Sequence, residues 1–159
     1  PEIDAEFLIV GDGPDRGVIE RMAADDSRIK LLGHVGRDEL ASILNTTNIF
    51  AFPTYYEGFG LAITEAMASG HACVSYDIQV VREVLGDTGV LVPLGATSAF
   101  VDEVARLVAE PERIAPLAEK AHDRASRFSW PDAEVAMERL ICDVGRSLVP
   151  GPTGVAAVR

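Results

Sequence analysis

The sequence has 159 residues, enough for one domain with a sizeable hydrophobic core and too few for two large ones. Its net charge of −11 comes from 14 basic and 25 acidic residues, which argues against a nucleic-acid partner or an anionic membrane patch, since both require clustered cations. No apolar stretch reaches the roughly 18 residues of a transmembrane segment, and the first residues lack the pattern of a signal peptide. Cys73 and Cys142 match no metal or redox spacing, which agrees with a reduced, cytoplasmic setting.

Short apolar runs alternate with helical patterns over the first two thirds of the chain. The predicted strands are residues 7–10, 29–32, 49–52, 72–76 and 89–92. The predicted helices between them are residues 16–24, 38–44 and one that begins near Leu61 and closes at Gly70. Continuously apolar strands are typical of a parallel sheet covered on both faces. The order therefore predicts an α/β domain with a Rossmann-like parallel sheet and helices on both faces.

From Ser98 onward the pattern is helical only. One helix is predicted from Ser98, and Pro111 and Pro131 mark two more, the last of which runs to about Leu148. The final residues are rich in proline and glycine and have no periodicity. We therefore predict a domain over residues 1–147 and a loosely held tail over residues 148–159.

Nearly every predicted strand ends in glycine or proline. These ends are residues 11–14, 33–36, 53–60 and 93–95. For any single loop, a tight strand-to-helix turn is a sufficient explanation. Because the carboxyl ends of parallel strands meet at one edge, the whole set favours a binding edge, where small residues let a ligand approach the backbone.

Several common cofactor motifs are absent from this edge. The run GDGPDRG at residues 11–17 has its third glycine one place too late for a dinucleotide fingerprint. No P-loop lysine and no D-x-D pair occurs, and the three histidines are not grouped as metal ligands. We therefore expect neither a metal ion nor a bound cofactor.

The stretch EGFGLAITE, residues 57–65, is the strongest candidate site. Its glycines lead into the helix that begins near Leu61, and free N–H groups at a helix N-terminus bind anions such as a diphosphate. Glu65 lies about one turn further on, among apolar residues, so its carboxylate is expected to be costly to bury unless it finds hydrogen-bond donors. The paired hydroxyls of a ribose would supply them. The alternative is that Glu65 only accepts from backbone amides and complements the helix dipole.

At these residues the sequence resembles the retaining glycosyltransferases of the GT-B group known as family 4. Their EX7E motif has two glutamates with seven residues between them, and residues 57–70 match its extended pattern E-G-F-G-L-x-x-x-E-A-x-A-x-G throughout. The runs FLIVGDGP, IKLLGHV, LVPLG and RFSW also occur in the family's order. The resemblance covers about residues 5–145.

The resemblance implies a role for each matched position. Glu65 would bind the ribose hydroxyls of the nucleotide, and Glu57 would contact the donor sugar near the reacting carbon, which makes it the candidate catalytic residue. The backbone of Gly58, Phe59, Gly60 and Leu61 would contact the sugar and diphosphate. The backbone at Val35 would contact the base, and Gly11 and Gly13 would line the nucleotide cleft. Such enzymes need no metal and transfer the sugar with retention, by front-face attack assisted by the leaving phosphate.

The sequence also departs from the family pattern. Residues 71–72 are His-Ala where the family has an apolar residue and proline, and DIQVVRE replaces a glycine-rich turn, with Glu83 in the place of a family glutamate. Family members have two such domains, and the arginine and lysine that clamp the diphosphate lie upstream of residue 7. The chain thus resembles the C-terminal half of a GT-B fold without its first strand-helix unit.

The resemblance predicts the half of a metal-independent hexosyltransferase that binds the nucleotide-sugar donor. The acceptor would be a glycan, a lipid or a small molecule, and the partner would be the missing N-terminal GT-B domain. This chain alone is expected to be inactive. A cytoplasmic location is expected. A peripheral position of the whole enzyme, at the inner face of the membrane, agrees with this expectation. The alternative function is a non-catalytic nucleotide-sugar-binding module or partner subunit.

Overall fold

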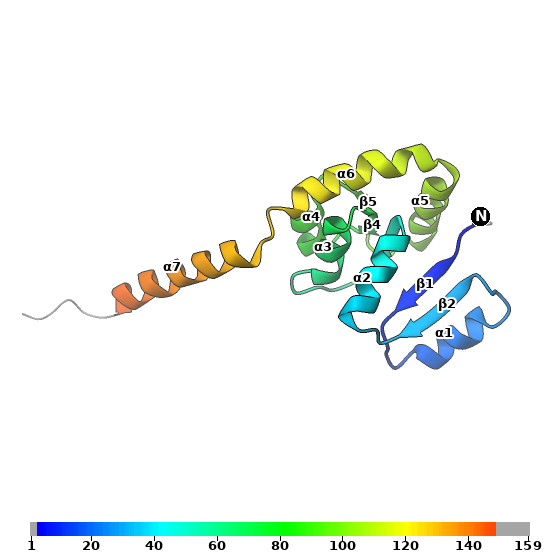
Figure 1. The fold of residues 1–159 in the computed structure, drawn as a ribbon, viewed down its shortest axis with the longest axis horizontal. Coiled ribbons are helices and arrows are strands. Elements are labelled where there is room, and N and C mark those ends of the chain that lie inside the picture. Colours follow the sequence, from blue (N-terminus) through cyan, green and yellow to red (C-terminus); the bar gives the residue numbers. More distant parts are fainter. Residues whose placement is uncertain (1–2, 149–159) are drawn as a thin grey trace, which may run out of the picture. The chain divides into compact units, whose positions relative to one another are not determined.

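The computed structural model describes residues 3–148 of the chain. The described residues divide into two compact units, one up to Ala125 and the other from Ser126. The first unit contains all five strands and the helices up to α6, and the described part of the second contains helix α7, Trp130–Leu148 (Figure 1). The predicted tail, residues 148–159, lies outside the described residues except for Leu148. The predicted domain of residues 1–147 stays a prediction.

The five strands lie where the apolar runs predict them. They are β1 (Phe7–Val10), β2 (Ile29–Gly33), β3 (Ile49–Phe52), β4 (Ala72–Tyr76) and β5 (Val90–Val92). The helices of the first unit are α1 (Arg16–Ala23), α2 (Arg37–Thr46), α3 (Leu61–Ala68), α4 (Gln79–Leu85), α5 (Thr97–Ala109), the short 3-10 helix η1 (Pro111–Arg113) and α6 (Ile114–Ala125). Helix α4 was not expected, because its seven residues are too few to show a helical period.

All strand pairs are parallel, and they form two hydrogen-bonded sheets. One sheet has the order β1-β2 and the other the order β3-β4-β5. The predicted α/β class with parallel strands between helices is confirmed. The strands of the first sheet lie side by side with α1 next to them (Figure 1).

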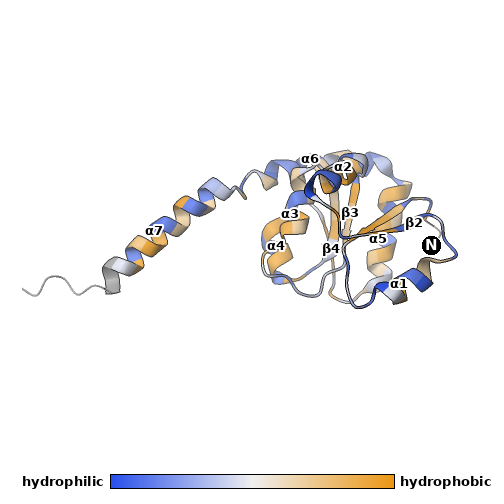
Figure 2. Ribbon diagram, turned by 60° about the horizontal axis from the view of Figure 1, so that its bottom comes forward, coloured by the Kyte–Doolittle hydropathy of each residue, from blue (hydrophilic) through white to orange (hydrophobic). Residues whose placement is uncertain are grey.

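The buried core belongs to the second sheet. All five residues of β4 are buried, because this strand has a neighbour at each edge and helices over its faces. Side chains from the surrounding helices complete the core, among them Ile63, Met67, Val81, Leu85 and Leu107. Figure 2 shows the same region as hydrophobic colour on the strands and on α4 and α5. Within residues 3–62, no side chain is buried.

Cys73 and His71 are among the polar or reactive side chains buried with this core. Cys73 lies fully buried in β4, and its burial raises the pKa of the thiol to about 12. His71 is fully buried between α3 and the end of α2. Its Nδ1 lies 3.0 Å from the carbonyl oxygen of Ala66 and its Nε2 lies 2.9 Å from Oγ1 of Thr47. Since a carbonyl can only accept, Nδ1 carries the proton of the neutral ring. Oγ1 of Thr47 also lies 3.0 Å from the carbonyl oxygen of Ile43, so its single proton is shared between that oxygen and Nε2 of His71.

This histidine predicts a pH dependence of stability. Burial lowers the pKa of His71 below 6.5 in the folded protein. Between the folded-state pKa and the unfolded-state pKa, His71 is therefore protonated in the unfolded chain and neutral in the folded chain. The stability that the neutral ring contributes is present above the unfolded pKa and is lost as the pH falls below it. We expect the melting temperature to fall more in wild type than in His71→Gln between about pH 7.5 and 5.5. If the melting temperature falls equally in wild type and in His71→Gln, the protonation state of His71 does not change on unfolding.

Candidate functional site

The loop before α3 has one residue that must be glycine. Gly60, at the N-cap of α3, has φ = 85° and ψ = 46°, a left-handed conformation that side chains disfavour. Its carbonyl oxygen accepts from the backbone N–H of Thr64 at 3.1 Å and from the Thr64 hydroxyl at 3.0 Å. The chain therefore turns sharply into the helix. By helix geometry, the N–H groups of Leu61, Ala62 and Ile63 have no acceptor within the helix.

Glu57 stands on this loop, and its side chain is half-buried. Its Oε1 lies 3.3 Å from the hydroxyl oxygen of Thr54, whose single proton is shared with the carbonyl oxygen of Tyr56 at 3.0 Å. Thr54 thus closes a small turn that holds the carboxylate near the end of β3. Sequence analysis missed this residue, although a threonine three residues before a glutamate is a common spacing for such a contact.

Glu65 lies in α3 and is exposed. The expectation that its carboxylate is costly to bury is therefore wrong. Ile63, Ala66 and Met67 form the buried face of α3, and Glu65 lies outside that face. The error arises because the alanines around Glu65 resemble core residues in composition, while only one side of the helix meets the core. An exposed carboxylate one turn from the helix N-terminus is accessible to a ligand.

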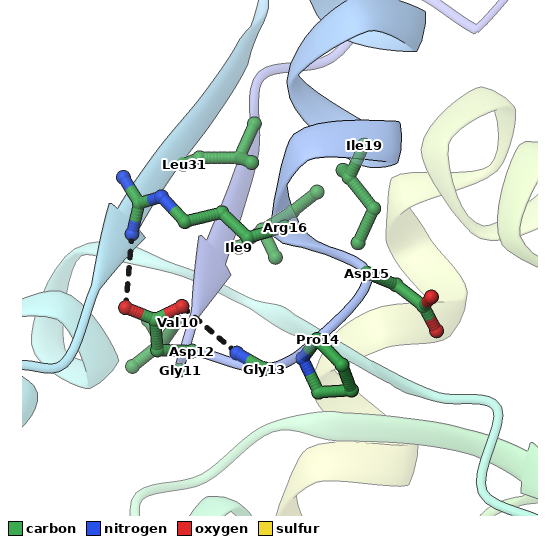
Figure 3. A pocket seen from close by; sticks show the side chains of 10 residues that line it. All are labelled: Ile9, Val10, Gly11, Asp12, Gly13, Pro14, Asp15, Arg16, Ile19 and Leu31. Carbon is green, nitrogen blue, oxygen red and sulfur yellow. Dashed lines mark hydrogen bonds and ion pairs between the residues drawn. The ribbon is translucent and has the colours of Figure 1, made fainter.

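Gly11 and Gly13 line a cavity of about 290 Å³ at the carboxyl end of β1 (Figure 3). Oδ1 of Asp12 accepts from the N–H of Gly13 at 2.8 Å. Arg16 points across the same cavity to Asp12, at 3.3 Å, and binds Glu20 at 2.7 Å. The hydrogen bond to Glu20 and the charges of both carboxylates raise the pKa of Arg16. The sequence places Arg16 only at the start of a helix and gives no sign of this pairing.

The predicted site residues thus fall into separate groups in the described structure. Residues 57–61 and Glu65 lie together around the start of α3. Gly11 and Gly13 share the cavity at β1, whose lining includes neither Val35 nor any residue of the α3 loop. Val35 is half-buried in the turn after β2.

The loops that follow β3 and β5 lie next to each other. The rings of Tyr55 and Tyr76 are 5.3 Å apart between centroids, and Tyr76 stacks in turn on Phe100 at 5.3 Å. A Cβ on Gly95 would lie 3.8 Å from the hydroxyl of Tyr55. Tyr55 remains 64% exposed, so it presents an aromatic surface beside the α3 loop. Sequence analysis did not single out this residue.

Within residues 3–148, no group of three or more His, Cys, Asp or Glu side chains is arranged to hold a metal ion. None of the helices in that range has the length and apolar character needed to cross a membrane.

Comparison with known proteins identifies the family. The model of the family "Glycosyl transferases group 1" matches residues 1–110. The chain belongs to the group 1 glycosyltransferases. Its α/β Rossmann-like fold is shared with GT-B glycosyltransferases of known structure.

Individual glycosyltransferases are similar over most of this chain. The N-acetyl-alpha-D-glucosaminyl L-malate synthase of Bacillus anthracis is 32% identical over 127 residues, which are 77% of this chain and 33% of that protein. The sucrose-phosphate synthase of Thermosynechococcus elongatus superposes with a TM-score of 0.76 at 25% identity, over 88% of this chain and 38% of the other. A pneumococcal O-GlcNAc transferase, GtfA, solved in complex with UDP and GlcNAc, gives a TM-score of 0.74 at 20% identity, over 87% and 29%. The chain therefore spans about a third of the length of these glycosyltransferases.

The conformation of Gly60 generates a prediction for the α3 loop. Gly60→Ala forces a side chain into the left-handed region and places its Cβ 3.1 Å from Cγ2 of Ile63. We expect it to lower the free energy of unfolding by about 1–2 kcal/mol in urea titrations. Gly58→Ala is the matched control, since its Cβ would meet nothing within 4 Å and its φ is not in that region. If both variants lose the same stability, the left-handed turn at Gly60 does not exist in solution.

Proposed function

We propose that this chain is the donor-binding half of a retaining, metal-independent glycosyltransferase. The donor would be a nucleotide-diphosphate sugar, from which a hexose-type sugar passes to a glycan, a lipid or a small-molecule acceptor. The observation that carries the proposal is the start of α3, where Gly60 exposes first-turn N–H groups between the carboxylates of Glu57 and Glu65. Membership of a glycosyltransferase family makes these groups candidates for donor recognition.

The N–H groups at the start of α3 and the carboxylates of Glu57 and Glu65 have complementary roles in the proposal. The N–H groups at the start of a helix, with the positive end of its dipole, stabilise the negative charge that develops on a leaving diphosphate. Glu65 is exposed and therefore free of the cost of burial, and it accepts from the two ribose hydroxyls. Glu57 is held by Thr54 at the loop before the helix and accepts from hydroxyls of the donor sugar.

Gly11 and Gly13 belong to the nucleotide cleft in the proposal, and Val35 to the base contact. The cavity at β1 leaves space beside both glycines, since a Cβ on either would meet nothing within 4 Å. Arg16 is neutralised by two carboxylates, so it adds little positive charge for a phosphate. The binding of UDP and GlcNAc by one structural neighbour agrees with a nucleotide-sugar donor. The partner in the whole enzyme would be an N-terminal GT-B domain.

The two glutamates are expected to respond differently to mutation. Glu65→Gln removes a charge-assisted acceptor worth about 1.5–3 kcal/mol, so affinity for UDP, GDP or ADP should fall roughly 10- to 150-fold in calorimetry. Glu57→Gln should leave the affinity for the bare nucleotide unchanged, because its partner is the sugar. In the whole enzyme it should lower turnover more than nucleotide affinity.

Glu119→Gln is the matched control, because Glu119 is an exposed carboxylate on α6, outside the loop. Melting temperatures of all three variants separate lost binding from lost folding. Unchanged nucleotide affinity in a folded Glu65→Gln variant would refute the proposed role of the α3 loop.

Metal independence is tested separately. Because backbone N–H groups carry the proposed diphosphate contact, we expect the calorimetric affinity for the preferred nucleoside diphosphate to be the same with MgCl₂ and with EDTA. Binding that disappears with EDTA and returns with excess Mg²⁺ would contradict the metal-free site.

A further inference from the structure

We propose that Tyr55 is a positioning residue for Glu57, because its ring holds the turn that carries this carboxylate against the end of β4. What Glu57 does there rests on the proposed function, whereas the contact of Tyr55 with β4 exists without any nucleotide. The bonds that shape this turn differ from the contact that fixes its place on the sheet.

The hydrogen bonds of the turn, residues 52–57, determine its shape. The backbone N–H of Thr54 donates to the carbonyl oxygen of Phe52 at 2.9 Å. The hydroxyl oxygen of Thr54 lies 3.0 Å from the carbonyl oxygen of Tyr56, 3.4 Å from the backbone nitrogen of Tyr56 and 3.3 Å from Oε1 of Glu57. Each of these bonds joins two residues of the same short segment. They therefore give the turn its form without tying it to β4 or β5.

The ring of Tyr55 provides that tie. Its centroid lies 5.3 Å from the centroid of Tyr76, the last residue of β4, with an angle of 65° between the ring planes. Aromatic pairs prefer this edge-to-face arrangement. The hydroxyl of Tyr55 reaches the loop after β5, since a Cβ on Gly95 would lie 3.8 Å from its oxygen. One side chain thus connects the turn to β4 and to the loop that follows β5.

Tyr76 is a firmly held partner for this contact. It is only 2% exposed, and its ring packs on Phe100 at 5.3 Å between centroids. Its hydroxyl oxygen lies 3.3 Å from Oγ1 of Thr97. Phe100 and Thr97 both belong to α5, so Tyr76 is fixed by a second element of the core. Tyr55 is therefore anchored to the core although 64% of its own surface is exposed.

The chain on the other side of Glu57 gives the carboxylate little restraint. Gly58 follows it directly and Gly60 begins α3, and a glycine backbone has access to more conformations than any other. A Cβ on Gly58 would meet nothing within 4 Å, so no packing compensates for this freedom. The position of Glu57 then depends on the residues before it. Of the two tyrosines there, Tyr56 is 85% exposed and contacts Thr54 through its backbone, which leaves Tyr55 as the anchor.

Backbone order parameters from NMR relaxation of the 159-residue protein, without ligand, test the contact. In wild type we expect values near 0.85 at residues 54–57, typical of a rigid backbone. Tyr55→Ala should lower them below about 0.6. Tyr55→Phe should retain them because the ring pair remains, and so should the matched control Tyr56→Ala. Unchanged values in Tyr55→Ala would overturn the proposal, and so would an equal loss in Tyr55→Phe.

Calorimetry measures the consequence for Glu57, with UDP, GDP and ADP compared with UDP-glucose, GDP-glucose and ADP-glucose. The strength of an aromatic pair corresponds to roughly 3- to 10-fold in an equilibrium constant. Tyr55→Ala should lower the affinity for the preferred nucleotide sugar by about that factor and leave the affinity for the bare nucleotide unchanged. In a Glu57→Gln background it should have no further effect, because Tyr55 acts through that carboxylate. A ring that only stabilises the fold would lower the melting temperature and leave the ratio of the two affinities as in wild type, which would contradict the positioning role.

Glu65→Gln distinguishes this proposal from the proposed function. If Glu65→Gln weakens nucleotide binding while Tyr55→Ala changes neither the order parameters nor the ratio of affinities, the donor site stands and the role of Tyr55 is wrong. If none of the six compounds binds to wild type, the proposed function is wrong. The order parameters then decide by themselves whether Tyr55 holds the turn of Glu57.

Discussion

The structure depends on the burial of β4, which has a hydrogen-bonded neighbour at each edge and all of its residues inside the core. β1 and β3 each have one neighbour, and both retain exposed apolar residues. The distribution of buried side chains follows from this difference. The core is built around the second sheet, while the first sheet and α1 contribute no buried side chain.

The candidate site lies at the carboxyl end of the well-packed sheet. Helix α3 is fixed by Ile63, Ala66 and Met67, which are fully buried, and by a glycine at each end. Gly60 begins the helix with φ = 85°, and Gly70 ends it with φ = 76°. A rigid helix of this kind gives its N-terminal amides a defined direction, which a preorganised anion site needs. Glu57 and Glu65 are held on either side of that N-terminus without being buried in the core.

The two groups of predicted site residues differ in how well the core supports them. The loop around α3 is supported by the core, whereas Gly11, Gly13 and Val35 belong to the β1-β2 sheet, which has little core beneath it.

The sequence by itself determined the five strands, most of the helices and the parallel arrangement, because continuous apolar runs between helical patterns are compatible with few other folds. The EGFGLAITE pattern also indicated the family, which the family match confirms, while its role as the site loop stays a prediction. Other features are decided only by the tertiary structure. Composition alone does not show which face of α3 meets the core, so the exposure of Glu65 was missed. The contacts of Thr54 with Glu57 and of His71 with Thr47 likewise depend on how separate segments pack. The division into two sheets was missed for the same reason, since the pairing of each strand edge depends on neighbours that are distant in the chain.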